Sequence, residues 1–288
     1  MADHYFGGAW TEIKLEILKK YLDFYTQALK NKPYELLYID AFAGSGNRSE
    51  KIPDAPLLGE NEQKLTYDGS ARIALDIERK FDRYLFIEAS KERCNALEAL
   101  KQEYPSQHIR IENSDANQVL QNICSNKKTW QSQKYRGVLF LDPYGNSVEW
   151  KTLEAIASTR SLDVWFLFPI SGMNRQLNHE FEKIEDYKER NLNKILGTDS
   201  WKTELYKREQ TQDLFGSTEK VSRVSMTDME KWVKQRLENC FPRVSKPLPL
   251  PHDRKPQQFS LFFCISNPDP KAIGLALKVA NHILKSPQ

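Results

Sequence analysis

The sequence lacks the usual marks of a secreted, membrane or zinc-binding protein. Only 4 of its 288 residues are cysteines, and they lie too far apart to form a CxxC pair. We therefore expect reduced, buried thiols and no metal site. No apolar run approaches the roughly 20 residues that a membrane-spanning helix needs. The first ten residues, MADHYFGGAW, have neither the basic start nor the apolar run of a secretion signal. These absences predict a soluble cytoplasmic protein with no membrane partner.

A strong excess of charge of one sign is also missing. The chain has 42 Lys and Arg against 39 Asp and Glu, which gives a formal net charge of +3. A dedicated non-specific nucleic-acid binder usually has a larger basic excess, so this balance neither requires nor excludes such a partner. The hydrophobic content of 40% and the aromatic content of 11% are sufficient for a folded core.

Short apolar runs alternate with helical patterns up to Pro169. The expected strands are 34–40, 83–88, 108–115, 137–145 and 163–169, and the expected helices are 12–30, one that Ser70 caps, 91–104, 116–125 and 149–158. Thr11 is the expected cap of the first helix, in which Ile13, Ile17 and Leu18 share one face. Strands that are apolar throughout are typical of parallel sheets covered on both faces. The pattern predicts an α/β, doubly wound, mostly parallel Rossmann-like sheet.

The alternation stops after the fifth strand. Residues 170–225 are polar and charged, with no clear strand, which predicts a helical insertion and a candidate substrate-recognition region. A helix at 227–239, a strand at 259–266 and an amphipathic helix at 270–285 then return to the core. We therefore divide the chain into a ligand-binding core with an N-terminal helix (1–169), the insertion (170–225) and the C-terminal part of the core (226–288).

Acidic residues stand at the ends of four successive predicted strands, at Asp40, Glu88, Asp115 and Asp142. In doubly wound sheets, ligands bind at the carboxyl ends of the strands, near the point where the strand order reverses. Carboxylates gathered along one edge would repel each other unless a ligand satisfies them. We therefore expect a ligand at this edge.

The stretch DAFAGSG (40–46) narrows the choice of ligand. A phosphate-binding P-loop needs a lysine after its glycines, but Gly46 is followed by Asn47 and Arg48. A dinucleotide fingerprint needs a third glycine, but position 49 is serine, and Asp40 would repel a pyrophosphate. S-adenosylmethionine (SAM) fits better, because it has an ammonium, a sulfonium and a ribose but no phosphate.

Each candidate ligand contact has a structural alternative. Asp40 can face the amino group, and Gly44 and Gly46 let the backbone approach the methionine part. Glu88 can accept both ribose hydroxyls, although a solvated acid at a strand end is as good an explanation for that residue alone.

The adenine and carboxylate contacts are assigned in the same way. Asp115 or Ser114 can meet the adenine amine, while Asp115 also suits a helix N-cap. Lys14 can reach the carboxylate of SAM, although a lysine on a first helix is more often solvated.

The motifs resemble a known family. The pattern D-x-F-x-G-x-G, formed by Asp40, Phe42, Gly44 and Gly46, resembles the first motif of class I SAM-dependent methyltransferases, and FLDPYG resembles the catalytic DPPY motif of nucleic-acid amino-methyltransferases. The segments WTEIKLEILKKYLDFY, YIDAFAGSG, FIEASKERCNALEAL, FLDPYG and FFCISNPDPKAIGLALKVA, in this order and over most of the chain, resemble the three-Cys-motif partner (TcmP) family. That resemblance implies a companion protein with a three-cysteine motif and supplies no substrate.

The DPYG stretch suits transfer of a methyl group to an exocyclic amine. The Asp142 carboxylate and the Pro143 carbonyl would accept the two N–H groups of the amine, which makes its nitrogen more nucleophilic. Tyr144 is the candidate for stacking a flipped-out base. In DPPY the aromatic residue comes fourth, whereas here Gly145 does, so Trp150 or Phe168 are alternatives for the stacking. A structural Asp-Pro turn is the competing interpretation of Asp142.

Three functions remain in view. The first is a SAM-dependent methyltransferase that acts on a nucleobase amine in DNA or RNA. The second is a methyltransferase-like module that works in a complex with the three-cysteine protein, and the third is a small-molecule methyltransferase with the insertion as a lid. Eight basic residues of the insertion are candidate phosphate contacts, although acidic residues interleave with them: Arg175, Lys183, Lys188, Arg190, Lys194, Lys202, Lys207 and Arg208.

Overall fold

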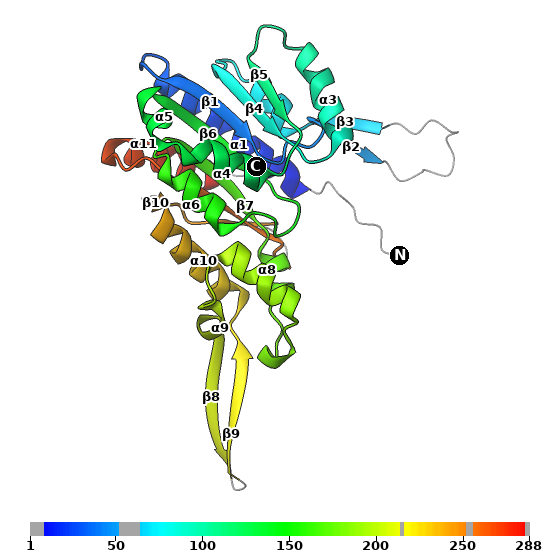
Figure 1. The fold of residues 1–288 in the computed structure, drawn as a ribbon, viewed down its shortest axis with the longest axis vertical. Coiled ribbons are helices and arrows are strands. Elements are labelled where there is room, and N and C mark those ends of the chain that lie inside the picture. The colour runs from blue at the N-terminus through cyan, green and yellow to red at the C-terminus, as the bar shows by residue number, and fades with distance from the viewer. Residues whose placement is uncertain (1–8, 52–63, 214–215, 252–255, 286–288) are drawn as a thin grey trace, which may run out of the picture.

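The chain folds around a twisted, mostly parallel sheet of eight strands (Figure 1). The computed structural model describes residues 9–51, 64–213, 216–251 and 256–285. The strand order is β10-β12-β7-β6-β1-β4-β5, and β11 also pairs with β12. The strands are β1 (Glu35–Asp40), β4 (Arg83–Ile87), β5 (Ile109–Glu112), β6 (Tyr135–Leu141), β7 (Leu162–Phe168), β10 (Arg243–Val244), β11 (Leu248–Leu250) and β12 (Phe259–Ile265). The central five strands are parallel, and β12 is antiparallel to β7.

Helices cover both faces of the sheet, which confirms the doubly wound fold expected from the sequence. One face packs against α1 (Ala9–Leu29), α2 (Ser70–Asp76), α3 (Lys91–Gln102) and α11 (Pro270–Lys285). The other packs against α4 (Ala116–Ser125), α5 (Lys127–Ser132), α6 (Trp150–Ser158) and α10 (Met226–Cys240). The apolar stripe predicted for the first helix is buried, with Ile17 and Leu18 at most 2% exposed. None of the described helices has the length and apolar character required to cross a membrane.

The strand order reverses at β1, and this sets where a ligand can bind. From β1 the chain first builds β4 and β5 on one side and then β6 and β7 on the other. Asp40 pairs in register with Phe86 on β4 and with Phe140 on β6. Since side chains alternate between faces along a strand, Asp40, Glu88 and Asp142 belong to the same face. Glu88 and Asp142 stand two residues beyond the partners of Asp40. Asp40 therefore lies further from the carboxyl end of the sheet than they do.

Two antiparallel hairpins differ from the sequence prediction. The polar segment after the glycines, in which no strand was predicted, contains β2 (Asn47–Lys51) and β3 (Lys64–Asp68). The N–H of Gly69 donates to the carbonyl oxygen of Gly46 at 3.1 Å, which closes the base of this hairpin. The turn after β1 is therefore joined directly to the start of α2, although the β2–β3 hairpin lies between them in the sequence.

The segment expected to be helical is helical only in its first part. It contains α7 (Ile170–Gln176), the short helix η1 (Phe181–Lys183), α8 (Asp186–Leu196) and α9 (Trp201–Glu204). The absence of a strand was predicted wrongly for residues 206–223, where β8 (Tyr206–Asp213) and β9 (Gly216–Arg223) form a hairpin. Figure 1 shows this hairpin projecting from the body of the molecule. Its strands are mainly polar, so they lack the apolar alternation by which strands are recognised.

Local details also depart from expectation. Helix α1 begins at Ala9, so Thr11 is not its cap. The N-cap of α2 is Gly69, and Ser70 is the first helical residue. The segment before β6 contains the short helix α5, where no helix was predicted. The four cysteines are free thiols, three of them buried and Cys240 half-buried.

Candidate functional site

Asp40 forms the floor of the candidate site. It is fully buried, and its carboxylate accepts hydrogen bonds from the N–H of Phe42 at 3.3 Å and from the hydroxyl of Tyr38 at 3.4 Å. Burial and, to a lesser extent, the nearby charge of Asp142 raise the pKa of Asp40, while hydrogen bonds from Ser70, Phe42 and Tyr38 lower it, and together they bring the pKa to about 7. The side chain is thus close to half-ionised at neutral pH, and a neighbouring cation would favour its charged form.

Glu88, directly after β4, connects three elements of the site. Its Oε2 accepts the N–H of Gly44 at 3.1 Å, and its Oε1 accepts the N–H of Ser90, the N-cap of α3, at 2.8 Å. The Nε of Arg93 also lies 3.3 Å from Oε1. Glu88 is 7% exposed, so this carboxylate is held in one place between the turn after β1 and the start of α3.

The turn after β1 needs its two glycines for different reasons. Gly44 has φ +61, and a Cβ placed on it would meet no atom of the described residues within 4 Å, so these residues leave open space beside it. Gly46 has φ +77, and a Cβ there would lie 2.6 Å from Cδ2 of Leu100 on α3. Gly46 therefore permits close packing against α3, while Gly44 borders the space in which a ligand can lie.

Asp142 follows β6 and is joined to α1. Its Oδ2 accepts a short hydrogen bond from Nζ of Lys14, which is buried, while the Asp142 side chain is 26% exposed. The expectation that Lys14 is solvated is therefore wrong, since it is buried and paired with Asp142, while its contact with a ligand carboxylate stays a prediction. Pro143 is buried, and Tyr144 is 71% exposed. The DPYG stretch thus presents an anchored acid beside an exposed aromatic ring.

Asn117 holds the DPYG loop against α4, and sequence reasoning missed it. This buried side chain donates to the carbonyl of Ser147 at 2.9 Å and accepts from the N–H of Glu149 at 2.9 Å. The hydroxyl of Thr152 also donates to it at 2.9 Å. A single asparagine in a helix carries no signal of such a role, because its partners lie about 30 residues away.

The remaining residues predicted to contact a ligand or a base range from exposed to buried. Asp115 is exposed and caps α4, accepting the N–H of Gln118 at 3.0 Å, which confirms the capping role. Ser114 beside it is half-buried, as is Phe42, which packs against the core on the α4 and α6 face. Trp150 and Phe168 are both 5% exposed and belong to that core, so neither is placed to stack a base.

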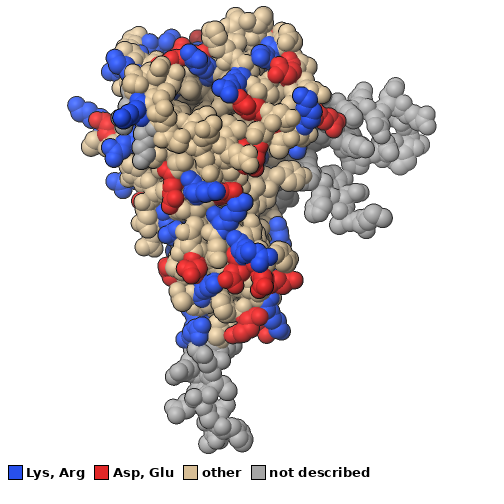
Figure 2. Space-filling view, in the orientation of Figure 1, with Lys and Arg blue, Asp and Glu red and all other residues tan. Residues whose placement is uncertain are grey.

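The basic residues of the insertion do not form a free positive face. Four of the eight pair with carboxylates: Lys183 with Glu180, Lys188 with Glu185, Lys194 with Glu149 and Lys202 with Glu189. Figure 2 shows positive and negative side chains mixed over the lower part of the molecule. No group of three or more His, Cys, Asp or Glu within the described ranges is arranged to hold a metal ion.

Comparison with known proteins finds similar folds and no similar sequences. No protein-family model matches the chain, and no curated protein matches it in sequence. The TcmP resemblance therefore remains a prediction. Among solved structures, protein LPL1258 from Legionella pneumophila matches with 15% identity and a TM-score of 0.46, over 96% of this chain and 94% of that one.

Two further solved structures are described as SAM-dependent methyltransferases. The one from Clostridium acetobutylicum has 11% identity and a TM-score of 0.34, over 86% of this chain and 92% of that one. The other, from Listeria monocytogenes, carries the same description provisionally, with 11% identity and a TM-score of 0.37, over 85% of this chain and 98% of that one. Likeness at this level does not assign an activity, so function rests on the residues of the site.

Proposed function

We propose that the protein is a SAM-dependent methyltransferase whose acceptor is an exocyclic amine of a nucleobase in DNA or RNA. The observation that carries the proposal is the position of Asp142. It follows β6, next to the reversal of strand order at β1, on the sheet face that also holds Asp40 and Glu88. A DPYG stretch at another strand end would be an ordinary turn.

The residues at this edge suit a cationic nucleoside without phosphates. Glu88 and Asp40 would repel a pyrophosphate, and the only buried Lys or Arg among the described residues, Lys14, is paired with Asp142. Glu88 offers carboxylate lone pairs to ribose hydroxyls, and the open space beside Gly44 accommodates the methionine part. The Asp40 carboxylate favours the ammonium group of SAM. Ser114, or Oδ2 of Asp115, meets the adenine amine. SAM, when bound here, supplies an electrophilic methyl group.

The side chains of DPYG orient the acceptor. Lys14 occupies Oδ2 of Asp142, which leaves Oδ1 for one N–H of the amine, while the Pro143 carbonyl accepts the other. These bonds direct the nitrogen lone pair at the methyl group. Asp142 can also take the proton that the methylated nitrogen sheds. The exposed Tyr144 ring offers a face on which a flipped-out base can stack.

A second candidate is a methyltransferase-like module that works in a complex with a three-cysteine-motif protein. The observation that favours it is the Lys14–Asp142 ion pair, since a carboxylate held by a lysine can be structural. In the enzyme the pair orients Asp142, whereas in the module it only anchors α1 to the sheet.

Labelled SAM offered with separate pools of DNA, RNA, protein and metabolites tests the proposal. We expect label in DNA or RNA, lost in Asp142→Asn and retained in the control Glu112→Gln, which changes another acid at a strand end. Label in metabolites would support the small-molecule alternative. Transfer that is unaffected by Asp142→Asn would contradict the catalytic assignment.

A stoichiometric complex with a three-cysteine protein and no transfer to any pool would favour the module. Salt provides a second criterion, because binding of a nucleic acid weakens steeply as salt rises, whereas binding of a small neutral acceptor does not. The projecting β8–β9 hairpin and the helices before it are the segment we assign to recognition of the target.

A further inference from the structure

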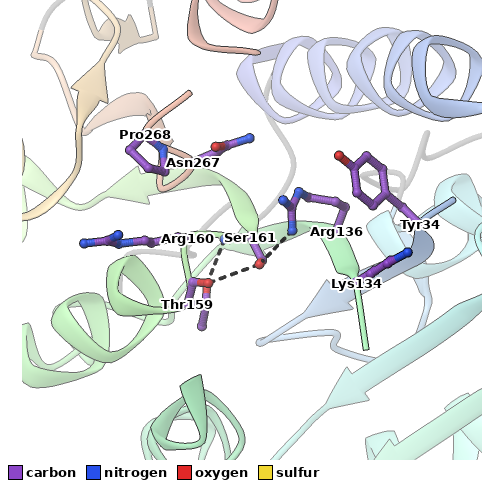
Figure 3. Close-up of a pocket in the computed structure, with 8 residues that line it drawn as sticks. All are labelled: Tyr34, Lys134, Arg136, Thr159, Arg160, Ser161, Asn267 and Pro268. Carbon is purple, nitrogen blue, oxygen red and sulfur yellow. Dashed lines mark hydrogen bonds between the residues drawn. The ribbon is translucent and has the colours of Figure 1, made fainter. Parts of the chain in front are cut away.

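A pocket lies at the opposite end of the parallel strands from Asp40, Glu88 and Asp142 (Figure 3). It has a volume of about 270 Å³ and is lined by Tyr34, Lys134, Arg136, Thr159, Arg160, Ser161, Asn267 and Pro268. These residues stand at the starts of β1, β6 and β7 and just after the antiparallel β12. The pocket therefore faces away from Asp40, Glu88 and Asp142, and the proposed transfer reaction makes no use of it.

Arg136 is the fixed element of this pocket. Its Nη1 donates to the carbonyl of Tyr135 at 2.8 Å and to the hydroxyl of Ser161 at 3.1 Å. Its guanidinium lies over the ring of Tyr34, 4.7 Å from the centroid. Within the described residues, Nε and Nη2 have no hydrogen-bond acceptor. A guanidinium held on one side with donors free on the other is prepared for an oxyanion.

Two more cations flank Arg136. Figure 3 shows Arg136 between Lys134 and Arg160, whose side chains extend to opposite sides, away from Arg136. Both flanking side chains are exposed. No carboxylate of the described part of the chain forms an ion pair with any of the three, and Asp269, after Pro268, caps α11 through the N–H of Ala272. Three basic residues therefore line the pocket without an ion-pair partner among the described residues, and the long, exposed side chains of Lys134 and Arg160 can turn towards a bound anion.

The backbone at the two flanking cations is unusual. Lys134 has φ 52 and Arg160 has φ 55, and they are the only non-glycine residues with positive φ among those described. Each follows the end of a helix, α5 or α6, where glycine would adopt this conformation without the steric cost. A cation near a helix C-terminus gains some energy from the helix dipole, but this accounts for neither the shared pocket nor the preorganised Arg136.

We propose that this pocket binds a phosphate group, with Arg136 as the bidentate anchor and Lys134 and Arg160 as flanking charges. The phosphate belongs either to a free anion or to the backbone of a nucleic acid, and both present the same tetrahedral oxyanion. The buried Asp163 carboxyl interacts electrostatically with Arg136 but lies outside ion-pair distance. It therefore leaves Nε and Nη2 of the guanidinium available to a phosphate.

The double variant Lys134→Gly/Arg160→Gly tests the proposal without endangering the fold. Glycine fits positive φ, so we expect the thermal midpoint to stay level or rise while the charges are lost. Inorganic phosphate binding, measured by titration calorimetry at constant ionic strength, should weaken about tenfold. The control Lys101→Gln/Lys231→Gln removes the same charge from α3 and α10, which do not line the pocket, and should bind phosphate like the wild type.

Two results would overturn the proposal. One is a wild-type protein with no phosphate binding above the chloride background. The other is a glycine double variant that binds phosphate as well as the wild type does. Arg136→Gln, if its thermal midpoint matches that of the wild type, should lose binding entirely, and retained binding would exclude Arg136 as the anchor.

A short single-stranded oligothymidylate distinguishes the two sources of phosphate. Binding that is tighter than for inorganic phosphate, and lost in the glycine double variant but not in the control, identifies a nucleic-acid backbone. Oligonucleotide binding that is equal in both variants identifies free phosphate. None of these measurements needs SAM, so failure here leaves the proposed function intact, and failure of that function leaves this site intact.

Discussion

The backbone N–H of Gly44 donates to Oε2 of Glu88 at 3.1 Å, so the turn after β1 and the end of β4 form one unit. On the other side of the turn, Gly46 accepts a hydrogen bond from Gly69 at 3.1 Å, which joins it to the start of α2. One glycine therefore borders ligand space and the other is packed. This difference can be measured.

Alanine substitutions should separate the two glycines. Gly46→Ala combines the cost of a positive φ with a Cβ 2.6 Å from Leu100, and we expect a loss of about 3 kcal/mol in unfolding free energy. Gly44→Ala has the same backbone cost and open space around the Cβ, so about 1 kcal/mol is expected. Urea denaturation measures both. Equal losses would contradict the packing described for Gly46.

The order of the two alanine variants should reverse when SAM affinity is measured, with the larger loss in Gly44→Ala. The Cβ of Gly44→Ala enters the space assigned to the methionine part, so SAM affinity should fall by at least about tenfold although the fold is nearly unaffected. A Gly44→Ala protein that binds SAM as the wild type does would place the ligand elsewhere.

Asp40 should make stability depend on pH. Its pKa is raised from about 4 in the unfolded chain to about 7 in the fold, so the folded state holds the proton more tightly. Its contribution is fully present below pH 4 and is lost as the pH rises towards 7. Asp40→Asn removes this loss. Relative to the wild type, it should therefore gain up to about 4 kcal/mol between pH 4 and pH 8.

Denaturation curves at several pH values measure this effect. The exposed Asp199→Asn serves as the control and should follow the wild type at every pH. If Asp40→Asn also runs parallel to the wild type, the carboxyl is not held in the buried, proton-favouring environment described here.

Lys14 and Asp142 should be energetically coupled. A double-mutant cycle of Lys14→Met and Asp142→Asn isolates their interaction, for which we expect about 1 kcal/mol, because Asp142 is partly exposed and solvent screens the pair. Unfolding in urea provides the four stabilities. Strict additivity would mean that α1 is not anchored through this pair.

Much of the fold followed from the sequence, for a physical reason. Buried parallel strands are apolar throughout, so runs such as those ending at Asp40 and Asp142 are readily recognised, and an acid marks the ends of four of the five predicted parallel strands. The hairpins β2–β3 and β8–β9 escaped prediction because polar ribbons away from the core carry no apolar alternation.

The residues of the site were predictable in part. Asp40, Glu88 and Asp142 stand at strand ends, and the strand order brings them to one edge. The bond between Ser70 and Asp40 and the pairing of Lys14 with Asp142 were not predicted, because both join segments that are distant in sequence. Asn117 joins segments distant in sequence, and local patterns do not report such contacts.

Titration calorimetry with SAM tests the central claim most directly. The account predicts saturable binding by the wild type, at least tenfold weaker binding by Glu88→Gln, and unchanged binding by the control Glu112→Gln. Absence of binding by a correctly folded wild-type protein, or equal affinity in Glu88→Gln, would contradict it.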